Sequence, residues 1–211
     1  MRKYSNTDKL IMKTNDIFNI FTGIKSSGRT YPAYNIEEQE IKSLDKKMIS
    51  NLMRVNHSGE VSAQGLYIGH ALLAKDESQK QLMLDMAAEE KNHLDWCERR
   101  INELGGKTSI FNPLWFAGSV AIGMLSSIRN NEQALGFIEE TEKQVAEHLE
   151  SHINKIPKED KKTYVILKKM KDDEKEHGNT ARNFGAEKVS KNLRKIMELT
   201  ASIMKFASYR L

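Results

Sequence analysis

Four stretches of the chain place apolar residues at intervals of three and four positions, with polar residues between them. This spacing puts the apolar side chains on one face of an α-helix. The predicted helices cover approximately residues 45–74, 77–104, 131–155 and 159–184. Short connections join the first helix to the second and the third to the fourth, so each pair is expected to form an antiparallel hairpin.

A longer connection of a different character separates the two hairpins. Gly105-Gly106 is expected to end the second helix, and about 25 residues follow before the third, enough to run the length of a bundle. No charged residue lies between Lys107 and Arg129, and Asn112-Pro113 is expected to start a helix there. Residues 114–128 are fewer than the roughly 20 needed to cross a bilayer. The crossover, about 107–130, is therefore predicted to be buried or interfacial.

The two ends of the chain have patterns of their own. Residues 1–35 show weak periodicity and are expected to form a loosely attached segment. From about residue 188 a further helix carries an apolar stripe with basic residues such as Lys191 and Arg194 beside it, a pattern that suits anionic lipid. The predicted fold is all-α: a ferritin-like four-helix bundle over residues 36–187 and an additional amphipathic helix over 188–211.

Composition agrees with one soluble domain and excludes some functions. The chain has 211 residues, 39% of them hydrophobic, and its one cysteine, Cys97, cannot form an internal disulfide. Charged residues such as Lys9, Lys13 and Asp16 interrupt any secretory signal, which favours the cytoplasm. The net charge is +4, but 29 acidic residues are mixed with the basic ones, so we expect no nucleic-acid partner.

Acidic residues on the apolar faces are the most informative feature. At about 100° per residue, Glu60, Glu90, Glu142 and Glu174 each fall among apolar side chains of one predicted helix. A buried, unpaired carboxylate costs several kcal/mol, so four that converge in one core require cations. Any one glutamate in a helix is more often solvated than a ligand. The four together nevertheless predict a metal site.

Two histidines strengthen this prediction because they repeat at matched positions. A histidine three residues after a glutamate lies on the same helix face, and oxygen-rich sites with one imidazole suit iron or manganese. One Glu-x-x-His motif would be weak evidence, whereas two at similar distances from two inward glutamates match the ligand set of di-iron bundles. The two halves supply Glu60 with Glu90 and His93, and Glu142 with Glu174 and His177.

Other residues on these faces carry weaker indications. Tyr67 lies one to two turns from Glu60 on the same face and could line the site, although packing alone would explain it. His148 lies about 120° from Glu142 around its helix, so it could flank the cavity or face solvent. Cys97 is expected to be a core residue rather than a reactive thiol.

Several motifs resemble one known family, the demethoxyubiquinone hydroxylases of the Coq7 type, which carry out the last ring hydroxylation in ubiquinone synthesis. The resemblance extends from about Asn51 to Gly185. Its most specific segments are residues 54–60 (RVNHSGE), 89–94 (EEKNHL), 96–100 (WCERR), 112–115 (NPLW), 140–145 (ETEKQV) and 173–178 (DEKEHG).

The resemblance implies a membrane-peripheral monooxygenase at the inner face of the cell membrane. It implies two iron ions per chain, held by the six residues above with Glu90 and Glu174 as bridges. The substrates would be a polyprenylated methoxy-methyl-benzoquinol and O₂, and further proteins of ubiquinone synthesis would be partners. An external reductant is required, either NADH or the quinol itself, and no glycine-rich dinucleotide motif is present.

Two other functions stay open from the residues alone. A ferroxidase or iron-storage bundle would use the same ligand set, although the uncharged crossover argues against a storage shell. A non-enzymatic membrane scaffold for a lipid-synthesis complex would not need the glutamates, so replacing Glu90 or Glu174 by alanine distinguishes it.

Overall fold

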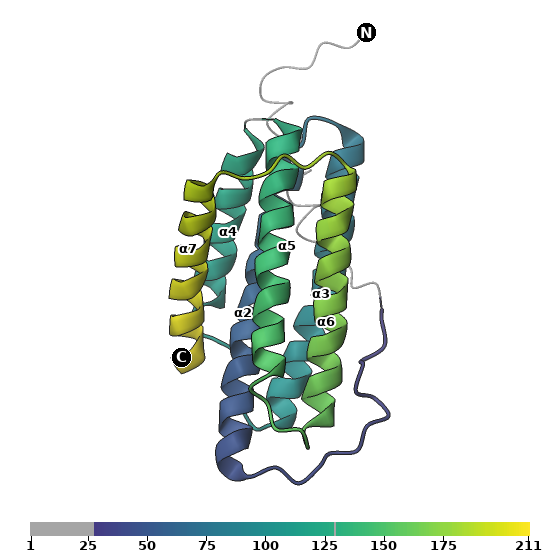
Figure 1. Cartoon of the computed structure of the whole chain (residues 1–211), viewed down its shortest axis with the longest axis vertical. Coiled ribbons are helices and arrows are strands. Elements are labelled where there is room, and N and C mark those ends of the chain that lie inside the picture. Colours follow the sequence, from purple (N-terminus) through teal and green to yellow (C-terminus); the bar gives the residue numbers. More distant parts are fainter. Residues whose placement is uncertain (1–27, 129) are drawn as a thin grey trace, which may run out of the picture.

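The computed structural model describes residues 28–128 and 130–211, which contain six helices and no strand (Figure 1). The helices are Ser43–Leu73 (α2), Glu77–Glu103 (α3), Asn112–Ser127 (α4), Asn131–Ile153 (α5), Lys161–Asn183 (α6) and Lys191–Arg210 (α7). Helices α2 and α3 form one antiparallel hairpin, α5 and α6 form a second, and the two pack into a bundle. The expected all-α, ferritin-like bundle is confirmed.

The helix ends follow from local sequence. The side chain of Asp76 accepts a hydrogen bond from the Gln79 amide at the start of α3 (2.7 Å), and Asp160 caps α6 in the same way. Gly105 and Gly185 follow α3 and α6 with φ of +74° and +96°, values that favour glycine because it has no Cβ. The bundle helices therefore begin and end within two residues of the predicted limits.

The apolar core has two parts, and the glutamates lie between them. On α3, Met86 belongs to one buried cluster and Cys97 to the other, with Glu90 between them in sequence. The glutamates predicted on α2, α5 and α6 also lie between residues of the two clusters. Cys97 is buried, as expected of a core residue. Close-packed apolar layers therefore enclose, from both sides, the level of the bundle that holds these four glutamates, called the acidic level below.

The crossover helix α4 packs closely along α2 because glycines line the contact. A Cβ on Gly65 would lie 2.7 Å from the carbonyl oxygen of Phe116, and one on Gly69 would overlap the carbonyl oxygen of Val120. Gly123 of α4 is equally close to the backbone of α2. These three positions let the two backbones approach more closely than larger side chains would permit.

Polar contacts fix both ends of α4 on α2. At the start of α4, the Asn112 amide donates to His57 Nδ1 (3.1 Å), and its oxygen accepts from Ser58 Oγ (2.8 Å). At the end of α4, Ser127 Oγ lies in hydrogen-bond contact with His70 Nδ1 (2.7 Å). The uncharged crossover therefore covers α2 with one face and exposes the other.

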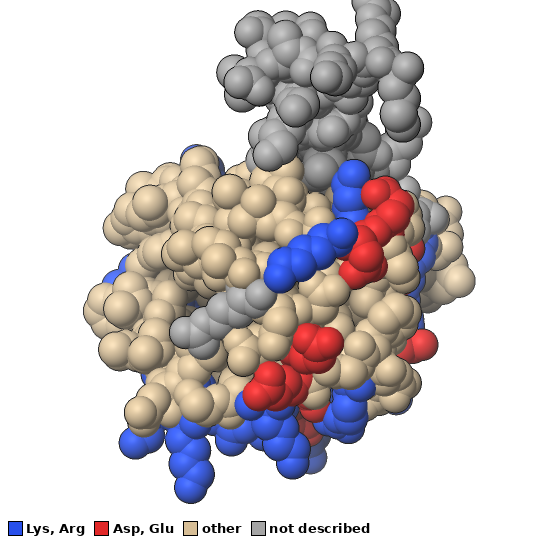
Figure 2. Space-filling view, turned by 90° about the horizontal axis from the view of Figure 1, so that it is seen from above, with Lys and Arg blue, Asp and Glu red and all other residues tan. Residues whose placement is uncertain are grey.

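Helices α4 and α7 present apolar side chains to solvent. Trp115 of α4 donates to Ser208 of α7 (3.1 Å), so the two helices are linked. Viewed down the bundle, the side on which they lie shows a broad area without charged side chains (Figure 2). No helix in the described residues is long and apolar enough to span a bilayer. The exposed apolar residues are Leu114, Ile122 and Leu125 of α4, and Ile196, Leu199, Ile203 and Phe206 of α7.

The segment before α2 differs from the expected loosely attached leader in the part that is described. Tyr31 and Ala33 are buried in the core, and Tyr31 donates to Glu103 (3.1 Å). The fully buried Arg100 of α3 donates to Glu38 (2.7 Å) and to Asp160 (2.9 Å). The expectation is therefore wrong for residues 28–35, and residues 1–27 lie outside the described part of the chain.

Candidate metal centre

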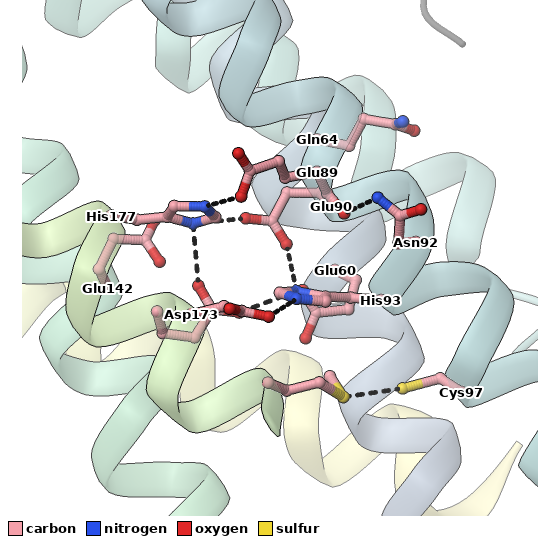
Figure 3. A network of polar contacts seen from close by, with 12 residues as sticks. Glu60, Gln64, Glu89, Glu90, Asn92, His93, Cys97, Glu142, Asp173 and His177 are labelled. Atoms are coloured by element: carbon pink, nitrogen blue, oxygen red, sulfur yellow. Dashed lines mark hydrogen bonds and ion pairs between the residues drawn. The ribbon is translucent and has the colours of Figure 1, made fainter. Parts of the chain in front are cut away.

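The four bundle helices bring all six predicted ligand residues together at the acidic level (Figure 3). Their ligand atoms form two groups, and within each group the atoms lie within 4.8 Å of one another. The groups are Glu60, Glu90, His93 and Glu174, and Glu90, Glu142, Glu174 and His177. Glu90 and Glu174 belong to both groups, which is the placement that carboxylates shared between two metal positions would need.

Both imidazoles direct the same nitrogen toward the shared carboxylates. His93 Nδ1 lies 3.0 Å from Glu90 Oε2 and 3.1 Å from Glu174 Oε1. His177 Nδ1 lies 3.2 Å from Glu90 Oε1 and 3.5 Å from Glu174 Oε2. The three-residue spacing within each Glu-x-x-His motif places both side chains on one helix face. The Nδ1 atoms are therefore the nitrogens available to a metal ion.

The other ring nitrogen of each histidine, Nε2, contacts a carboxylate from the opposite helical hairpin. His93 Nε2 of α3 is 3.1 Å from Asp173 of α6, and His177 Nε2 of α6 is 2.9 Å from Glu89 of α3. Such contacts fix the ring and raise its basicity as a ligand. The sequence prediction missed Asp173 and Glu89. A shared feature could have revealed them, because each immediately precedes the glutamate of a Glu-x-x-His motif.

The four inner carboxyl groups divide into two electrostatic classes. Burial, followed by the charge of Glu174, raises the pKa of Glu60 and Glu142 well above the usual range. Burial also opposes the ionisation of Glu90 and Glu174. Contacts with His93 and His177 nevertheless lower the pKa of Glu90, and the hydrogen bond from Glu142, followed by those from His177 and His93, lowers the pKa of Glu174. The surroundings therefore favour the neutral forms of Glu60 and Glu142 and the ionised forms of Glu90 and Glu174.

The pKa values of the two histidines are shifted in the opposite sense to those of Glu90 and Glu174. Burial alone would lower the pKa of His93, but the charge of Glu90 and the hydrogen bond to Asp173 raise it well above its ordinary value. Burial opposes protonation of His177 too, and contacts with Glu174 and Glu89 raise its pKa. The carboxylates around both rings thus favour the protonated form of each imidazole.

Several possible metal-ligand atoms of these residues have no hydrogen-bond partner, which fits a metal ion. In the described part of the chain, Glu90 Oε1, Glu142 Oε2, Glu174 Oε1 and His177 Nδ1 are buried without a hydrogen-bond partner. Glu90 Oε1 is close to His177 Nδ1, and Glu174 Oε1 is close to His93 Nδ1, but neither pair is aligned as a hydrogen bond. Buried polar atoms are rarely left unsatisfied, so this concentration indicates a missing ligand. The oxygen-rich donor set with one nitrogen per group could hold a metal ion such as iron or manganese.

The two other candidates lie in different surroundings. Tyr67 is fully buried, and its hydroxyl donates to Glu142 Oε1, so it borders the metal centre. His148 belongs to neither ligand group, and its ring packs edge-on against His152, with 4.0 Å between centroids. Burial and nearby Lys205 of α7 lower the pKa of His148 to about 4. His148 therefore lies toward α7 rather than among the inner carboxylates.

A groove between α5 and α6 approaches the centre from the protein surface. Its volume is about 570 Å³, and its lining includes Glu174 and Gly178. Most of the other lining side chains are charged, among them Lys143, Lys175 and Arg182. Glu142 itself is buried and does not line the groove, and a Cβ on Gly178 would only make ordinary contact with it, 3.5 Å from Glu142 Cβ. The groove therefore brings charged surface residues next to Glu174.

The fold and this site define a class: four-helix bundles with a buried, carboxylate-rich centre able to hold metal. Within that class the chain matches the family model described as "Ubiquinone biosynthesis protein COQ7" over residues 47–208. The match covers most of the chain, which therefore belongs to this family and confirms the resemblance of its motifs.

Relatives of similar length carry one activity in their names. The chain is 41% identical to 3-demethoxyubiquinol 3-hydroxylase of Chromobacterium violaceum, covering 96% of this chain and 98% of the relative. It is 41% identical to the protein of that name from Legionella pneumophila (strain Paris), covering 99% of both. Identity to the protein of that name from Xanthomonas euvesicatoria is 37%, over 100% of this chain and 97% of the relative.

Proposed function

We propose that the chain hydroxylates a polyprenylated methoxy-methyl-benzoquinol with O₂ in ubiquinone biosynthesis, as a 3-demethoxyubiquinol 3-hydroxylase. The supporting observation is the buried centre in which Glu90 and Glu174 serve both ligand groups, in a chain alike over nearly its whole length to proteins of that name. In this reaction one oxygen atom enters the ring, and the other leaves as water. Two electrons and two protons balance the equation.

The proposed cofactor is a pair of iron ions, which supplies the redox chemistry for O₂ activation when bound. Charge balance supports two divalent ions. Two divalent ions would balance the charges of the four inner carboxylates beside two neutral imidazoles, and the protons held by the ligands would be released on binding. One ion would have Glu60 and His93 as terminal ligands, the other Glu142 and His177, with Glu90 and Glu174 as bridges.

The surrounding residues would orient the ligands and exclude water. Asp173 and Glu89 hold the two imidazole rings, so each Nδ1 stays directed inward. Tyr67 keeps a proton on its hydroxyl beside Glu142, since burial raises the pKa of this tyrosine well above its usual range. The apolar clusters on both sides keep bulk water from reactive species at the centre.

The electrons are proposed to come from outside the chain, from NADH or from the quinol substrate. The sequence has no glycine-rich dinucleotide motif, so NADH would have to bind without that structure. The α5–α6 groove offers a polar approach to Glu174, and the lipophilic substrate is proposed to arrive from the other side, where α4 and α7 are exposed.

We place the protein at the cytoplasmic face of the cell membrane, attached through α4 and α7. Exposed apolar side chains of both helices, with lysines and arginines along α7, suit insertion into the interface of an anionic bilayer. The isoprenoid tail of the substrate resides in that layer. Partner proteins of ubiquinone synthesis could bind the same apolar surface.

The direct test combines metal content with activity. The full chain is expressed anaerobically, iron per chain is measured, and quinol hydroxylation with O₂ is followed in the wild type and in Glu174→Gln. We expect two irons per wild-type chain, and loss of both iron and hydroxylated product in the variant. Glu176→Ala is the matched control, because this glutamate lies on the same helix but is exposed.

Other outcomes would point elsewhere. A folded, metal-free wild type without activity would leave the scaffold function. Iron oxidation and deposition without quinol hydroxylation would favour a ferroxidase. Equal loss of activity in Glu176→Ala would contradict the assignment of Glu174.

A further inference from the structure

A second pocket lies outside the metal centre and is lined by the start of α2 and the residues that follow α3. These two segments lie at the same end of the bundle (Figure 1). Its volume is about 520 Å³, within the range of small-molecule sites. Arg54 precedes the ligand Glu60 by six residues, or about 9 Å along the helix axis. The pocket is therefore separate from the inner carboxylates and from the α5–α6 groove.

The charged side chains that line this pocket are all cations. They are Lys46, Lys47 and Arg54, and no aspartate or glutamate is among the lining residues. Within the described ranges none of the three has a carboxylate oxygen within 4.0 Å, whereas buried Arg100 is paired with several. Three unpaired cations around one cavity repel one another, so a bound anion would stabilise this arrangement.

The pocket also contains two buried donor atoms without partners, one on a neutral hydroxyl and one on a guanidinium. Ser50 is 4% exposed, and its Oγ lacks a hydrogen-bond partner in the described structure. Arg54 Nε is likewise buried without a partner, although the Arg54 Nη2 group donates to Asn51 (2.6 Å). Buried donors of this kind usually have an acceptor, and the cavity beside them is where an acceptor would lie.

Local geometry explains why these groups converge. Lys46 and Lys47 come three and four residues after Ser43, Ser50 comes three residues after Lys47, and Arg54 comes four after Ser50, so the five share one face of α2. Gly106 opposes this face, and a Cβ there would overlap Ser50 Oγ. A larger residue at position 106 would displace that hydroxyl from its place at the pocket wall.

The N-terminus of α2 adds to the positive potential in the pocket. The cap position of α2 has no side-chain hydrogen bond, whereas side chains cap α3, α5, α6 and α7. The amides of its first turn, beginning at Ser43 in the pocket lining, are thus available to an acceptor. Lysine, arginine, hydroxyl and helix-end amides together are the donors that bind phosphate groups.

We propose that this pocket, formed by Lys46, Lys47, Ser50, Arg54 and Gly106, is a binding site for a phosphate group. The phosphate belongs either to a soluble metabolite or to the headgroup of an anionic phospholipid, and both have the same chemistry at the pocket. The site does not depend on iron or on quinol hydroxylation.

The test uses two charge-matched double variants of the full chain. Lys46→Gln with Lys47→Gln removes two exposed pocket cations, and Lys161→Gln with Lys168→Gln removes two exposed lysines of α6 that do not line it. Ser50→Ala removes the buried hydroxyl. Inorganic phosphate and NADH are titrated by calorimetry, and vesicles with or without phosphatidylglycerol are tested by co-sedimentation.

We expect phosphate-bearing ligand affinity to fall about tenfold or more in the pocket double variant, to fall in Ser50→Ala, and to be unchanged in the α6 double variant. Binding of phosphate or NADH identifies a soluble source. A pocket-dependent loss of vesicle binding alone identifies the headgroup. Equal losses in both double variants, or no binding of any probe to the wild type, would overturn the proposal.

Discussion

His93 has carboxylates at both ring nitrogens, and this arrangement makes Asp173 a residue of interest. Asp173 also pairs with Arg29 (2.8 Å) and Lys169 (2.6 Å), and hydrogen bonding outweighs burial to lower its pKa to about 2. Asp173→Asn keeps the size but removes the charge that makes His93 a stronger ligand. We expect iron affinity to fall about 10- to 100-fold while the helical fold persists. Iron titration with circular dichroism measures both.

Asp172→Asn provides the comparison, since Asp172 is adjacent and exposed. It should leave iron affinity unchanged. If both variants bind iron as the wild type does, Asp173 has no influence on the metal through His93.

For single residues, the sequence allowed the candidate metal ligands to be predicted, but not the carboxylates that contact the two histidines from outside the ligand groups. Glu90 and His93 could be selected because one helix period places them on an apolar face. Asp173 and Glu89 act on histidines of the opposite hairpin, so their role depends on how α3 and α6 pack. That packing is a tertiary property, which no periodicity within a single helix contains.

The contact between α2 and α4 depends on glycine at its closest points. A Cβ on Gly69 would overlap the Val120 carbonyl and lie 2.9 Å from the Met124 amide nitrogen, and backbone atoms cannot rotate away. Gly69→Ala should therefore destabilise the protein by about 1–3 kcal/mol, as overpacked cores are. Urea unfolding of the variant and the wild type gives the difference.

Gly59→Ala is a control on the same helix, because a Cβ there meets no atom within 4 Å. Alanine is the better helix former, so this variant should match the wild type or exceed it by up to about 1 kcal/mol. Destabilisation of the two variants by similar amounts would contradict a steric origin at Gly69.

The contact between α2 and α4 should weaken in acid, because the buried His70 lies in hydrogen-bond contact with Ser126 and Ser127. Burial lowers the pKa of His70 to about 4. The unfolded chain, with a histidine pKa near 6.5, binds more protons between these values, so His70 stabilises fully above pH 6.5 and progressively less toward pH 4. Between these limits the unfolding free energy of the wild type should fall more steeply than that of His70→Gln, by up to about 1.4 kcal/mol per pH unit. Identical slopes would refute the assignment.

Helices and irregular segments differed in how well they could be predicted. Long amphipathic helices such as α3 and α6 were found nearly to their ends, because their periodicity and caps are local. The packed segment around Tyr31 was not found, since an irregular chain leaves no period even when two of its side chains are buried. The close α2–α4 contact was also missed, because isolated glycines in a helix have no partner until the tertiary fold supplies one.

The molecule as a whole has two different sides. The α5–α6 side carries a charged groove that reaches Glu174, whereas the side of α4 and α7 exposes apolar residues beside lysines and arginines. Under the proposed function, an aqueous reactant and a lipid-borne one would meet different faces of the bundle. The division is what the proposed attachment to a bilayer surface would require.

Membrane attachment through α4 and α7 can be tested with exposed residues alone. Leu125 of α4 and Phe206 of α7 are 66% and 64% exposed, so replacing both by glutamine should not disturb the core. Binding to anionic vesicles should fall at least about tenfold, since two large apolar side chains no longer enter the interface. Tyr164→Gln with Phe184→Gln is the control, because these side chains of the α6 region are 45% and 53% exposed. Co-sedimentation at low and high salt separates the apolar from the electrostatic part, and equal losses in the control variant would show that α4 and α7 are not the attachment surface.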